Sequence, residues 1–178
     1  LMEKSIDCPV QTIHSGPAAG IMGALATAHI QEDAVALDIG GTTTDISFFA
    51  DGVPLLDPLG VTIDDKKTLI RGLHTKSIGV GGDSVVQVDH GSLRIGPQRE
   101  GPAAALGGAF PTPTDAMIVR DMVHFGDQQK AKDAISSLAG RLNMTVEDTA
   151  LAVVEKTASI IADHVRQMLS DINNKPVY

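Results

Sequence analysis

The sequence is most constrained where an apolar run ends in a glycine pair followed by three threonines. The run Ala34–Ile39 predicts a buried strand, and the alternating segment Thr44–Phe49 predicts a second strand. Gly40 and Gly41 lie between them and lack Cβ atoms. The N–H groups of such a turn can approach and cradle a phosphate group closely. These residues therefore predict a hairpin whose turn is a candidate phosphate site.

Two carboxylates, Asp38 and Asp45, bracket this turn. Carboxylates near a phosphate are natural partners of hydrated Mg²⁺, and one of the two could orient an attacking water or hydroxyl. The hydroxyls of Thr42, Thr43 and Thr44 add hydrogen-bond donors for the phosphate. The alternative is an ordinary hairpin with a Gly-Gly turn and two surface acids. The residues alone leave both interpretations open, and they do not say which aspartate would activate the water.

Composition excludes several classes of function. The chain has 178 residues, enough for one domain with its own core, and a net charge of −8. This acidic balance argues against nucleic acid or an anionic membrane surface as a partner. A single cysteine excludes a disulfide framework and favours a reducing, cytoplasmic setting. An uncharged stretch near the N-terminus fails as a membrane span, because its apolar part Ala18–Ala28 has 11 residues where about 20 are needed.

The remaining elements are predicted from periodicity and turn residues. Ser15 is expected to cap a helix of small residues over Gly16–Ala26, with Pro17 in its first turn. Asp51-Gly52 predicts a hairpin turn. Further strands are expected at Val53–Leu56, His74–Ile78, Val85–Asp89 and Ser92–Ile95. Asp127 and Thr145 are expected to cap two C-terminal helices, the second of them long and amphipathic.

The segment Gly96–Thr114 has no periodicity and is rich in Gly, Pro and Ala, so it predicts a long irregular loop of the kind that is usually functional or mobile. Asp115 directly after it is expected to cap the next helix. Arg99 and its charged neighbours are expected to form a solvated edge of the loop.

The stretch from Asp38 to Asp45 resembles the phosphate loop of the actin/Hsp70/sugar-kinase ATPase superfamily. There, an Asp-x-Gly-Gly-Thr turn joins the first strands of a ribonuclease-H-like lobe, and nucleotide binds between two such lobes. The order of elements is similar to that of the second lobe. Gly79–Asp83 resembles the Gly-Gly-acid turn that follows the third strand. The resemblance implies an α/β fold, with a mixed sheet and packed helices, and it places Gly81, Gly82 and Asp83 in the wall of the nucleotide pocket.

A closer resemblance is to the hydantoinase/5-oxoprolinase family. Four segments carry it in order: Ser15–Gly20, Asp38–Asp45, Gly79–Ser84 with its trailing hairpin, and Gly107-Gly108 followed by Pro111–Ala116. Members of this family use ATP to phosphorylate a lactam or cyclic-imide oxygen, which makes the ring amide hydrolysable. Relatives are carboxylase subunits that activate ketones by phosphorylation. The resemblance implies ATP and Mg²⁺ as cofactors, with Asp38 and Asp45 at the metal or the water.

Two departures from the family pattern bear on the activity. The family tends to have a third glycine where Asp83 stands, and a Pro-Gly-Pro-x-Cys-Tyr-Gly stretch where this chain has Gly101–Gly107. A role that depends on that Cys or Tyr does not carry over. The resemblance therefore leaves three alternatives: an ATP-dependent hydrolase of cyclic amides, a carboxylase subunit that needs partner chains, and a non-catalytic nucleotide-sensing module.

The chain begins with Leu1 rather than Met, and we expect it to be a piece of a longer protein. In the resemblance, residues 1–178 form a single domain equivalent to the second lobe. The first lobe of the parent chain and the adenosine-binding turn would lie outside it. The piece is then half of an ATP site, and we expect weak nucleotide binding by this piece alone.

Overall fold

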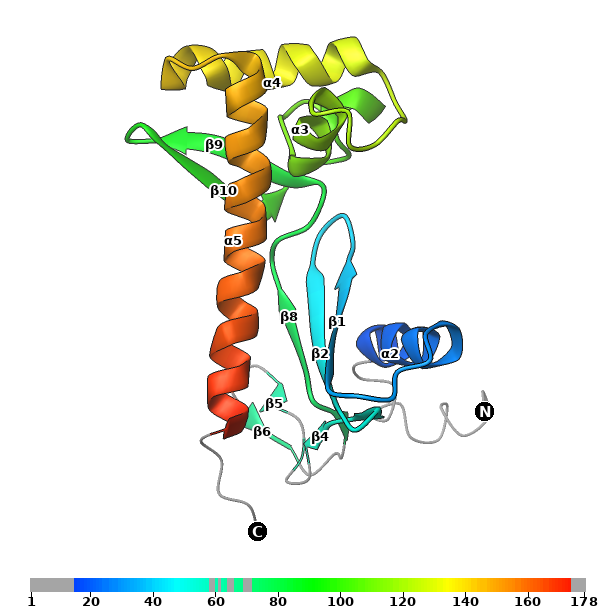
Figure 1. Ribbon diagram of the computed structural model, residues 1–178. Helices are drawn as coiled ribbons and strands as arrows, with labels where there is room; N and C mark the ends of the chain where they lie inside the picture. The colour runs from blue at the N-terminus through cyan, green and yellow to red at the C-terminus, as the bar shows by residue number, and fades with distance from the viewer. Residues whose placement is uncertain (1–14, 58–59, 61, 64–65, 69–71, 174–178) are drawn as a thin grey trace. The chain divides into compact units, whose positions relative to one another are not determined.

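The computed structural model describes residues 15–57, 60, 62–63, 66–68 and 72–173 (Figure 1). The chain divides into two compact units. Unit 1 comprises Leu1–Asp38 and Asp45–Ile78, and unit 2 comprises Ile39–Thr44 and Gly79–Tyr178. The glycine turn of the first hairpin thus belongs to unit 2, whereas the two aspartates that bracket it belong to unit 1. The mixture of helices and antiparallel strands is an α/β fold, as the sequence predicts.

Unit 1 is built on a four-stranded sheet in which β1, β2 and β3 follow one another and β8 also pairs with β2. A helix of small residues, α2, precedes the sheet. The bounds are α2 Ser15–Thr27, β1 Ala34–Ile39, β2 Thr44–Ala50, β3 Val53–Pro54 and β8 Thr75–Ile78. The turn between β2 and β3 has Asp51 at φ 49° and Gly52 at φ 77°, the left-handed conformations that a tight hairpin requires. The Asp-Gly turn is therefore confirmed.

Strand β1 departs from the sequence prediction in its burial. Its bounds are those predicted, but Val35, Leu37 and Ile39 are 42%, 44% and 56% exposed. The apolar run predicted a buried strand, and this was wrong for the described structure: the three residues alternate along β1, so they share one face of the sheet, and the described residues leave that face exposed. Its partner β2 is the buried strand, with Ile46, Phe48 and Phe49 in the core.

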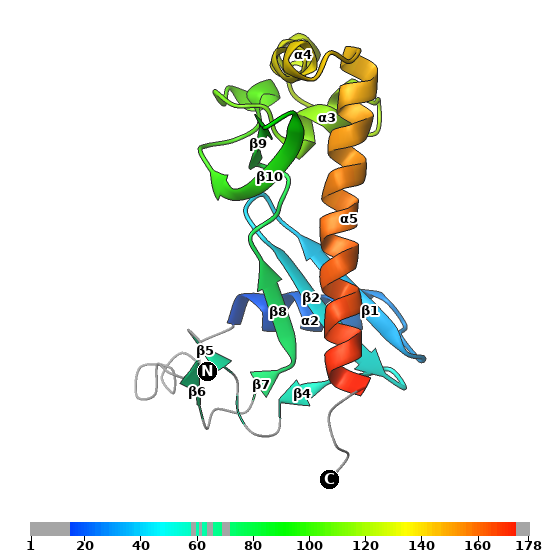
Figure 2. The same ribbon diagram turned by 90° about the vertical axis from the view of Figure 1, so that its left-hand side faces the viewer.

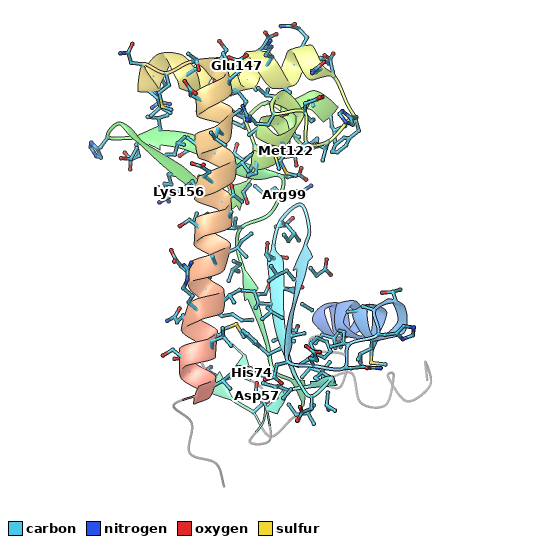
Figure 3. All side chains as sticks on the ribbon, viewed as in Figure 1. Asp57, His74, Arg99, Met122, Glu147 and Lys156 are labelled. Atoms are coloured by element: carbon cyan, nitrogen blue, oxygen red, sulfur yellow. The ribbon has the colours of Figure 1, made fainter. Side chains whose placement is uncertain are left out.

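Short strand pairs complete unit 1. The strand predicted over Val53–Leu56 is divided, since β3 ends at Pro54 and a separate strand begins at Leu56. These short strands form two antiparallel pairs, β4 Leu56–Asp57 with β7 Gly72–Leu73 and β5 Thr62–Ile63 with β6 Lys66–Lys67. His74 Nδ1 lies 2.9 Å from Asp57 Oδ1 beside the first pair (Figure 3).

Unit 2 consists of a long hairpin and three helices. The bounds are β9 Ser84–Asp89, β10 Ser92–Arg99, the 3₁₀ turn η2 Ala104–Leu106, α3 Pro113–Val119, α4 Gln128–Leu142 and α5 Val146–Asn173. Helix α3 packs against both α4 and α5, and α5 contacts β10 (Figure 2). Among the described helices, none combines the length and hydropathy that a membrane span requires.

Both predicted helix caps of unit 2 are present. The Asp127 carboxylate accepts hydrogen bonds from the N–H groups of Gln129 and Lys130 at the start of α4. The Thr145 hydroxyl accepts one from the N–H of Asp148 at the start of α5. In α5 the predicted apolar face is buried at Ala150, Val153, Ile161 and Met168. These local signals were readable because a cap satisfies N–H groups that the helix itself leaves unpaired.

The segment predicted as one long irregular loop is more ordered than expected. Its first residues, Gly96–Arg99, continue β10, and α3 begins at Pro113. Asp115 orders the part between them. Its side chain is fully buried, and besides forming a capping box with Thr112 it accepts hydrogen bonds from the N–H groups of Ala104 (3.0 Å) and Ala105 (2.8 Å). Asp115 takes part in the cap as expected, but from within the first turn, because the N-cap is Thr112 and the helix begins at Pro113. The same carboxylate holds the turn η2 to the start of α3.

We expect Asp115→Ala to lower the free energy of unfolding of unit 2 by at least about 2 kcal/mol, because it leaves several buried donors without an acceptor. Asp148→Ala is the matched control. Asp148 forms the same kind of cap with Thr145 at an exposed position, so its removal should cost about 1 kcal/mol or less. Urea unfolding of the two variants checks the difference, and equal losses would contradict the anchoring role.

Candidate functional site

Two glycine segments of unit 2 are held together by backbone hydrogen bonds. The N–H of Gly82 donates to the carbonyl of Gly40 at 2.9 Å, and the N–H of Asp83 donates to the carbonyl of Gly41 at 2.8 Å. We call the five residues Gly40, Gly41, Gly81, Gly82 and Asp83 the glycine clasp. It joins the predicted phosphate turn to the Gly-Gly-acid turn, two motifs that are some forty residues apart in the sequence.

At Gly81, the two segments of the clasp approach each other too closely to leave room for a side chain. A Cβ atom on Gly81 would lie 2.5 Å from the Gly40 carbonyl oxygen and 2.7 Å from the carbonyl carbon of Gly41. These obstacles are backbone atoms, which cannot rotate away as a side chain can. Gly81 is therefore required by the close approach of the two segments.

Neighbouring side chains hold the clasp from its flanks. The fully buried hydroxyl of Thr44 donates to the carbonyl of Val80 at 2.7 Å, and the buried hydroxyl of Ser84 accepts from the N–H of Gly81 at 2.9 Å. From the fourth motif of the sequence, the N–H of Thr114 donates to the carbonyl of Gly82 at 2.9 Å. Three of the four sequence motifs therefore meet within unit 2.

The hydrogen bonds of the clasp use some of the N–H groups that the sequence assigned to a phosphate and leave others free. The N–H groups of Gly82 and Asp83 are used inside the clasp, and the N–H of Gly40 donates to the carbonyl of Thr43 at 2.9 Å. Within the described residues, the N–H groups of Gly41, Thr42 and Thr43 have no acceptor. Three successive free N–H groups at a turn are donors that an anion can accept. The hydroxyls of Thr42 and Thr43 adjoin these N–H groups, whereas that of Thr44 is already donated.

The negatively charged carboxylate of Asp83 lies next to the same turn. Its Oδ2 atom lies so close to Gly41 that a Cβ atom there would meet it at 2.5 Å. The same oxygen accepts hydrogen bonds from Arg99, at 2.8 Å from Nη2 and 3.3 Å from Nε (Arg99 is labelled in Figure 3). Arg99, expected as a solvated edge of a loop, is therefore the partner of a residue of the clasp.

The pairing of Arg99 with Asp83 depends on a shift in the register of the β9–β10 hairpin. Near the His90-Gly91 turn the strands pair regularly, and an unbroken register would place Ser84 opposite Pro97. An irregularity between Ile95 and Arg99 places Arg99 opposite Ser84 instead. The sequence analysis missed Arg99 because the turn fixes only the regular part of the register. The nearest signal was the Gly96-Pro97 pair, which favours such an irregularity.

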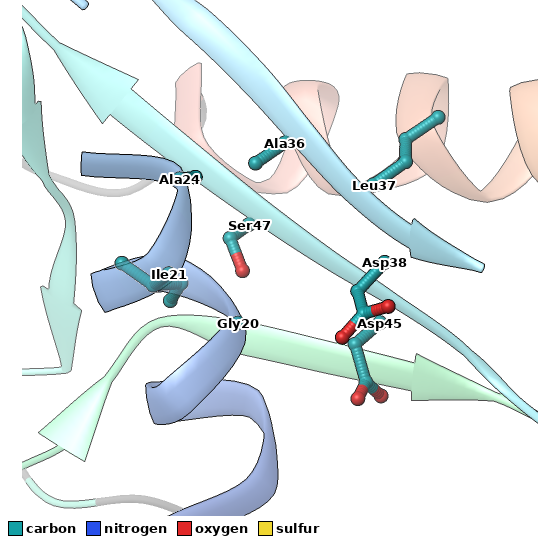
Figure 4. Close-up of a pocket in the computed structure, with 8 residues that line it drawn as sticks. All are labelled: Gly20, Ile21, Ala24, Ala36, Leu37, Asp38, Asp45 and Ser47. Carbon is teal, nitrogen blue, oxygen red and sulfur yellow. The ribbon is translucent and has the colours of Figure 1, made fainter. Parts of the chain in front are cut away.

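The two candidate metal-binding aspartates lie in unit 1, where they line a cavity of about 290 Å³ between α2 and the β1–β2 strands (Figure 4). Figure 4 shows the carboxyl groups of Asp38 and Asp45 at the same end of this cavity, near Gly20 of α2. A Cβ atom on Gly20 would lie 3.0 Å from Asp38 Oδ2. The first sequence motif therefore contributes the small residue that leaves room for the Asp38 carboxylate.

Asp45 has an unusual environment within this cavity. Among the described residues, its Oδ1 atom is buried and has no hydrogen-bond partner. A buried carboxylate oxygen is costly to leave unpaired, so the site suits a cation or a strong donor. The described part of the chain holds no cluster of three or more His, Cys, Asp or Glu side chains. A cation held here would therefore keep several waters, which is how Mg²⁺ is usually bound.

Comparison with known proteins identifies the family. The model of the hydantoinase/oxoprolinase family matches residues 2–176, and the chain belongs to this family. The acetophenone carboxylase gamma subunit of Aromatoleum aromaticum is 32% identical over 118 residues, covering 61% of this chain. The 5-oxoprolinase of Saccharomyces cerevisiae is 33% identical over 120 residues, also 61% of this chain. The family resemblance seen in the sequence is confirmed.

A solved structure gives the same family in three dimensions. A nucleotide-free acetone carboxylase, from work on ATP-dependent acetone carboxylation, matches with a TM-score of 0.77 and 26% identity over 89% of this chain. The chain spans a small part of each of these proteins: 16% of the acetophenone carboxylase subunit, 9% of the 5-oxoprolinase and 25% of the acetone carboxylase chain. The relatives include both a hydrolase and carboxylases, so the family alone does not separate these activities.

The clasp makes a direct prediction about Gly81. We expect Gly81→Ala to lower the free energy of unfolding by about 2 kcal/mol or more, because the new methyl group meets backbone atoms that must move apart. Gly140→Ala is the control, since Gly140 lies exposed in α4 with nothing within 4 Å of the new Cβ. It should be neutral or stabilising by up to about 1 kcal/mol. Urea unfolding midpoints compare the two, and a Gly81→Ala variant as stable as the control would show that the segments are not in close contact.

Proposed function

We propose that this chain supplies one half of an ATP site in a longer enzyme of the hydantoinase/oxoprolinase family. The observation that carries the proposal is the set of three free N–H groups on Gly41, Thr42 and Thr43, held open by the clasp. These groups and the hydroxyls of Thr42 and Thr43 bind phosphate oxygens. Gly40, Gly81, Gly82 and Asp83 form the wall that fixes the turn, and Thr44 holds the clasp from beneath. In this proposal the chain is a ribonuclease-H-like lobe, the second of two.

Asp38 and Asp45 form the acidic part of the proposed site. The unpaired Oδ1 atom of Asp45 and the carboxylate of Asp38 fit a hydrated Mg²⁺ ion. When bound, the ion neutralises the negative charge that gathers on a transferring phosphoryl group. One of the two carboxylates also orients the attacking water or hydroxyl and accepts its proton. Gly20 leaves room for this arrangement, because a Cβ atom there would lie only 3.0 Å from Asp38 Oδ2.

The substrate that we propose is a cyclic amide such as a hydantoin or 5-oxoproline. Transfer of the terminal phosphoryl group of ATP to the ring carbonyl oxygen releases ADP and makes the amide carbon open to attack by water. The ring nitrogen then takes up a proton and leaves, which breaks the C–N bond and opens the ring to an acyl phosphate. A second water displaces the phosphate and leaves a free carboxylate. The family assignment and the similarity to a 5-oxoprolinase support this choice. The first lobe, elsewhere in the parent chain, completes the nucleotide site.

A second candidate is an ATP-dependent carboxylase subunit that activates a ketone and works with partner chains. The observation in its favour is the match to acetone carboxylase over 89% of this chain with a TM-score of 0.77. The Gly101–Gly107 segment, which lacks the Cys and Tyr expected of the family, is compatible with a different substrate. The same phosphate site and the same two aspartates serve either reaction.

Stimulation of ATP hydrolysis by substrate separates the candidates. We expect the full-length protein to hydrolyse ATP faster in the presence of 5-oxoproline, hydantoin or a related lactam. Stimulation by acetone or acetophenone with bicarbonate, and by no lactam, would favour the carboxylase. Turnover that ignores both groups of compounds, or no turnover by a folded protein, would contradict both enzymatic proposals and leave the sensing module.

Replacing Asp38 or Asp45 by Asn in the full-length protein should lower the rate of ATP hydrolysis at least about tenfold, equivalent to about 1.4 kcal/mol of barrier. Asn keeps the size of the side chain but removes the charge that holds the cation and takes up the proton. Asp171→Asn, at an exposed position of α5, is the control and should keep the parent rate. If neither Asp38→Asn nor Asp45→Asn slows the enzyme beyond this control, the assignment of the two aspartates is wrong.

A further inference from the structure

The carboxylate of Asp83 is an unexpected neighbour for a phosphate site. Its Oδ2 atom lies against Gly41, whose N–H is one of the three free donors. A negative charge there repels an incoming phosphate, because like charges at short range oppose each other strongly. The charge of Asp83 therefore needs a counter-charge if the turn is to hold an anion.

Arg99 compensates this charge in the structure. Two of its nitrogens, Nε and Nη2, approach one oxygen of Asp83, and this leaves the Nη1 donors unused by Asp83. The side chain of Arg99 is 42% exposed, whereas that of Asp83 is 16% exposed. The carboxylate is thus fixed beside the turn, and the guanidinium remains accessible to a ligand that enters from solvent.

We propose that Arg99 is an additional phosphate-binding residue of this site and that Asp83 is the acceptor with which the phosphate must compete. This inference rests on the proposed function. A guanidinium binds phosphate and carboxylate through the same planar set of donors, so either anion can be its partner. A singly charged anion gains little over Asp83. A pyrophosphate group offers more negative charge and more oxygen atoms, so the Arg99 guanidinium leaves the Asp83 carboxylate and binds the pyrophosphate instead.

The pair therefore selects for ligands with more than one phosphate. The partner of Arg99 therefore depends on whether the turn is occupied. Arg99 pairs with Asp83 when the turn holds no anion, and with the phosphate when one is bound. A purely structural role is the alternative, in which the ion pair only fastens the end of β10 to the clasp. The two roles predict opposite changes in polyphosphate affinity for the Asp83→Asn variant. Removal of the Asp83 charge strengthens polyphosphate binding in our proposal, and weakens the binding of every anion if the pair is only a fastening.

The test uses the full-length protein and calorimetric titration with magnesium pyrophosphate, inorganic phosphate and Mg-ATP. We expect Arg99→Gln to weaken pyrophosphate and ATP binding at least about tenfold and inorganic phosphate binding less than about threefold. Asp83→Asn should strengthen pyrophosphate binding by about threefold or more. The double variant should bind pyrophosphate more tightly than Arg99→Gln alone, because it no longer holds an uncompensated carboxylate.

Arg166→Gln is the matched control. Arg166 also pairs with an aspartate, Asp163, at 2.7 Å, but on the exposed face of α5. It should leave all three affinities unchanged. Urea unfolding of each variant shows whether a loss of binding reflects a loss of folding, and Arg99→Lys, which keeps the charge but not the planar donors, should restore part of the pyrophosphate affinity.

The outcomes distinguish a failure of the Arg99 proposal from a failure of the proposed ATP site. If the parent protein binds ATP and Arg99→Gln binds it equally well, the role of Arg99 is overturned while the proposed ATP site stands. If Asp83→Asn and Arg99→Gln weaken the binding of all three ligands to the same degree, the ion pair has only a structural role and the inference is overturned. If the folded parent protein binds neither pyrophosphate nor ATP, the proposed function fails and this inference fails with it.

Discussion

Two backbone hydrogen bonds, from Gly82 to Gly40 and from Asp83 to Gly41, are the interactions on which the candidate site depends. They use the carbonyl groups of the first glycine turn and leave the N–H groups of Gly41, Thr42 and Thr43 unpaired among the described residues. The carbonyls of Gly40 and Gly41 are thereby occupied, while three successive N–H groups of the same turn stay free. In our proposal these N–H groups bind the anion, because oriented peptide dipoles supply positive partial charge without a cationic side chain.

The close approach that these bonds require explains the surrounding sequence. Gly81 has no room for a side chain, Thr44 and Ser84 satisfy groups that the approach would otherwise bury unpaired, and Thr114 brings in the segment that ends at Asp115. Asp115 then orders the turn at Ala104 and Ala105. The glycine turn is in this way connected to the helical part of unit 2 through a series of hydrogen bonds.

Local signals in the sequence predicted most of the elements, and long-range contacts account for what was missed. The Asp-Gly turn, the caps at Asp127 and Thr145 and the strand bounds of β1 depend on neighbouring residues and were readable. The exposure of one face of β1 depends on which other residues cover that face, and no local pattern encodes this. The partner of Asp83 depends on a register shift in β10, and the three N–H groups left free depend on a second segment far along the chain.

The two aspartates illustrate the same limit for function. Their position on either side of a glycine turn suggested a role near phosphate, and the cavity with the unpaired oxygen of Asp45 supplies an independent reason to expect a cation there. The family assignment adds that relatives of this chain include a 5-oxoprolinase and carboxylases. In our proposal the chain contributes the same thing to either reaction, a means of holding phosphate and its counter-ion.

The most direct test of this account is the response of individual amide groups to magnesium pyrophosphate, followed by NMR on the isotope-labelled protein. The account predicts large, saturable shifts of the amide signals of Gly41, Thr42 and Thr43, with much smaller shifts at Gly82 and Asp83, whose N–H groups stay in the clasp. Saturable binding that shifts other amides and leaves those three unchanged would contradict it.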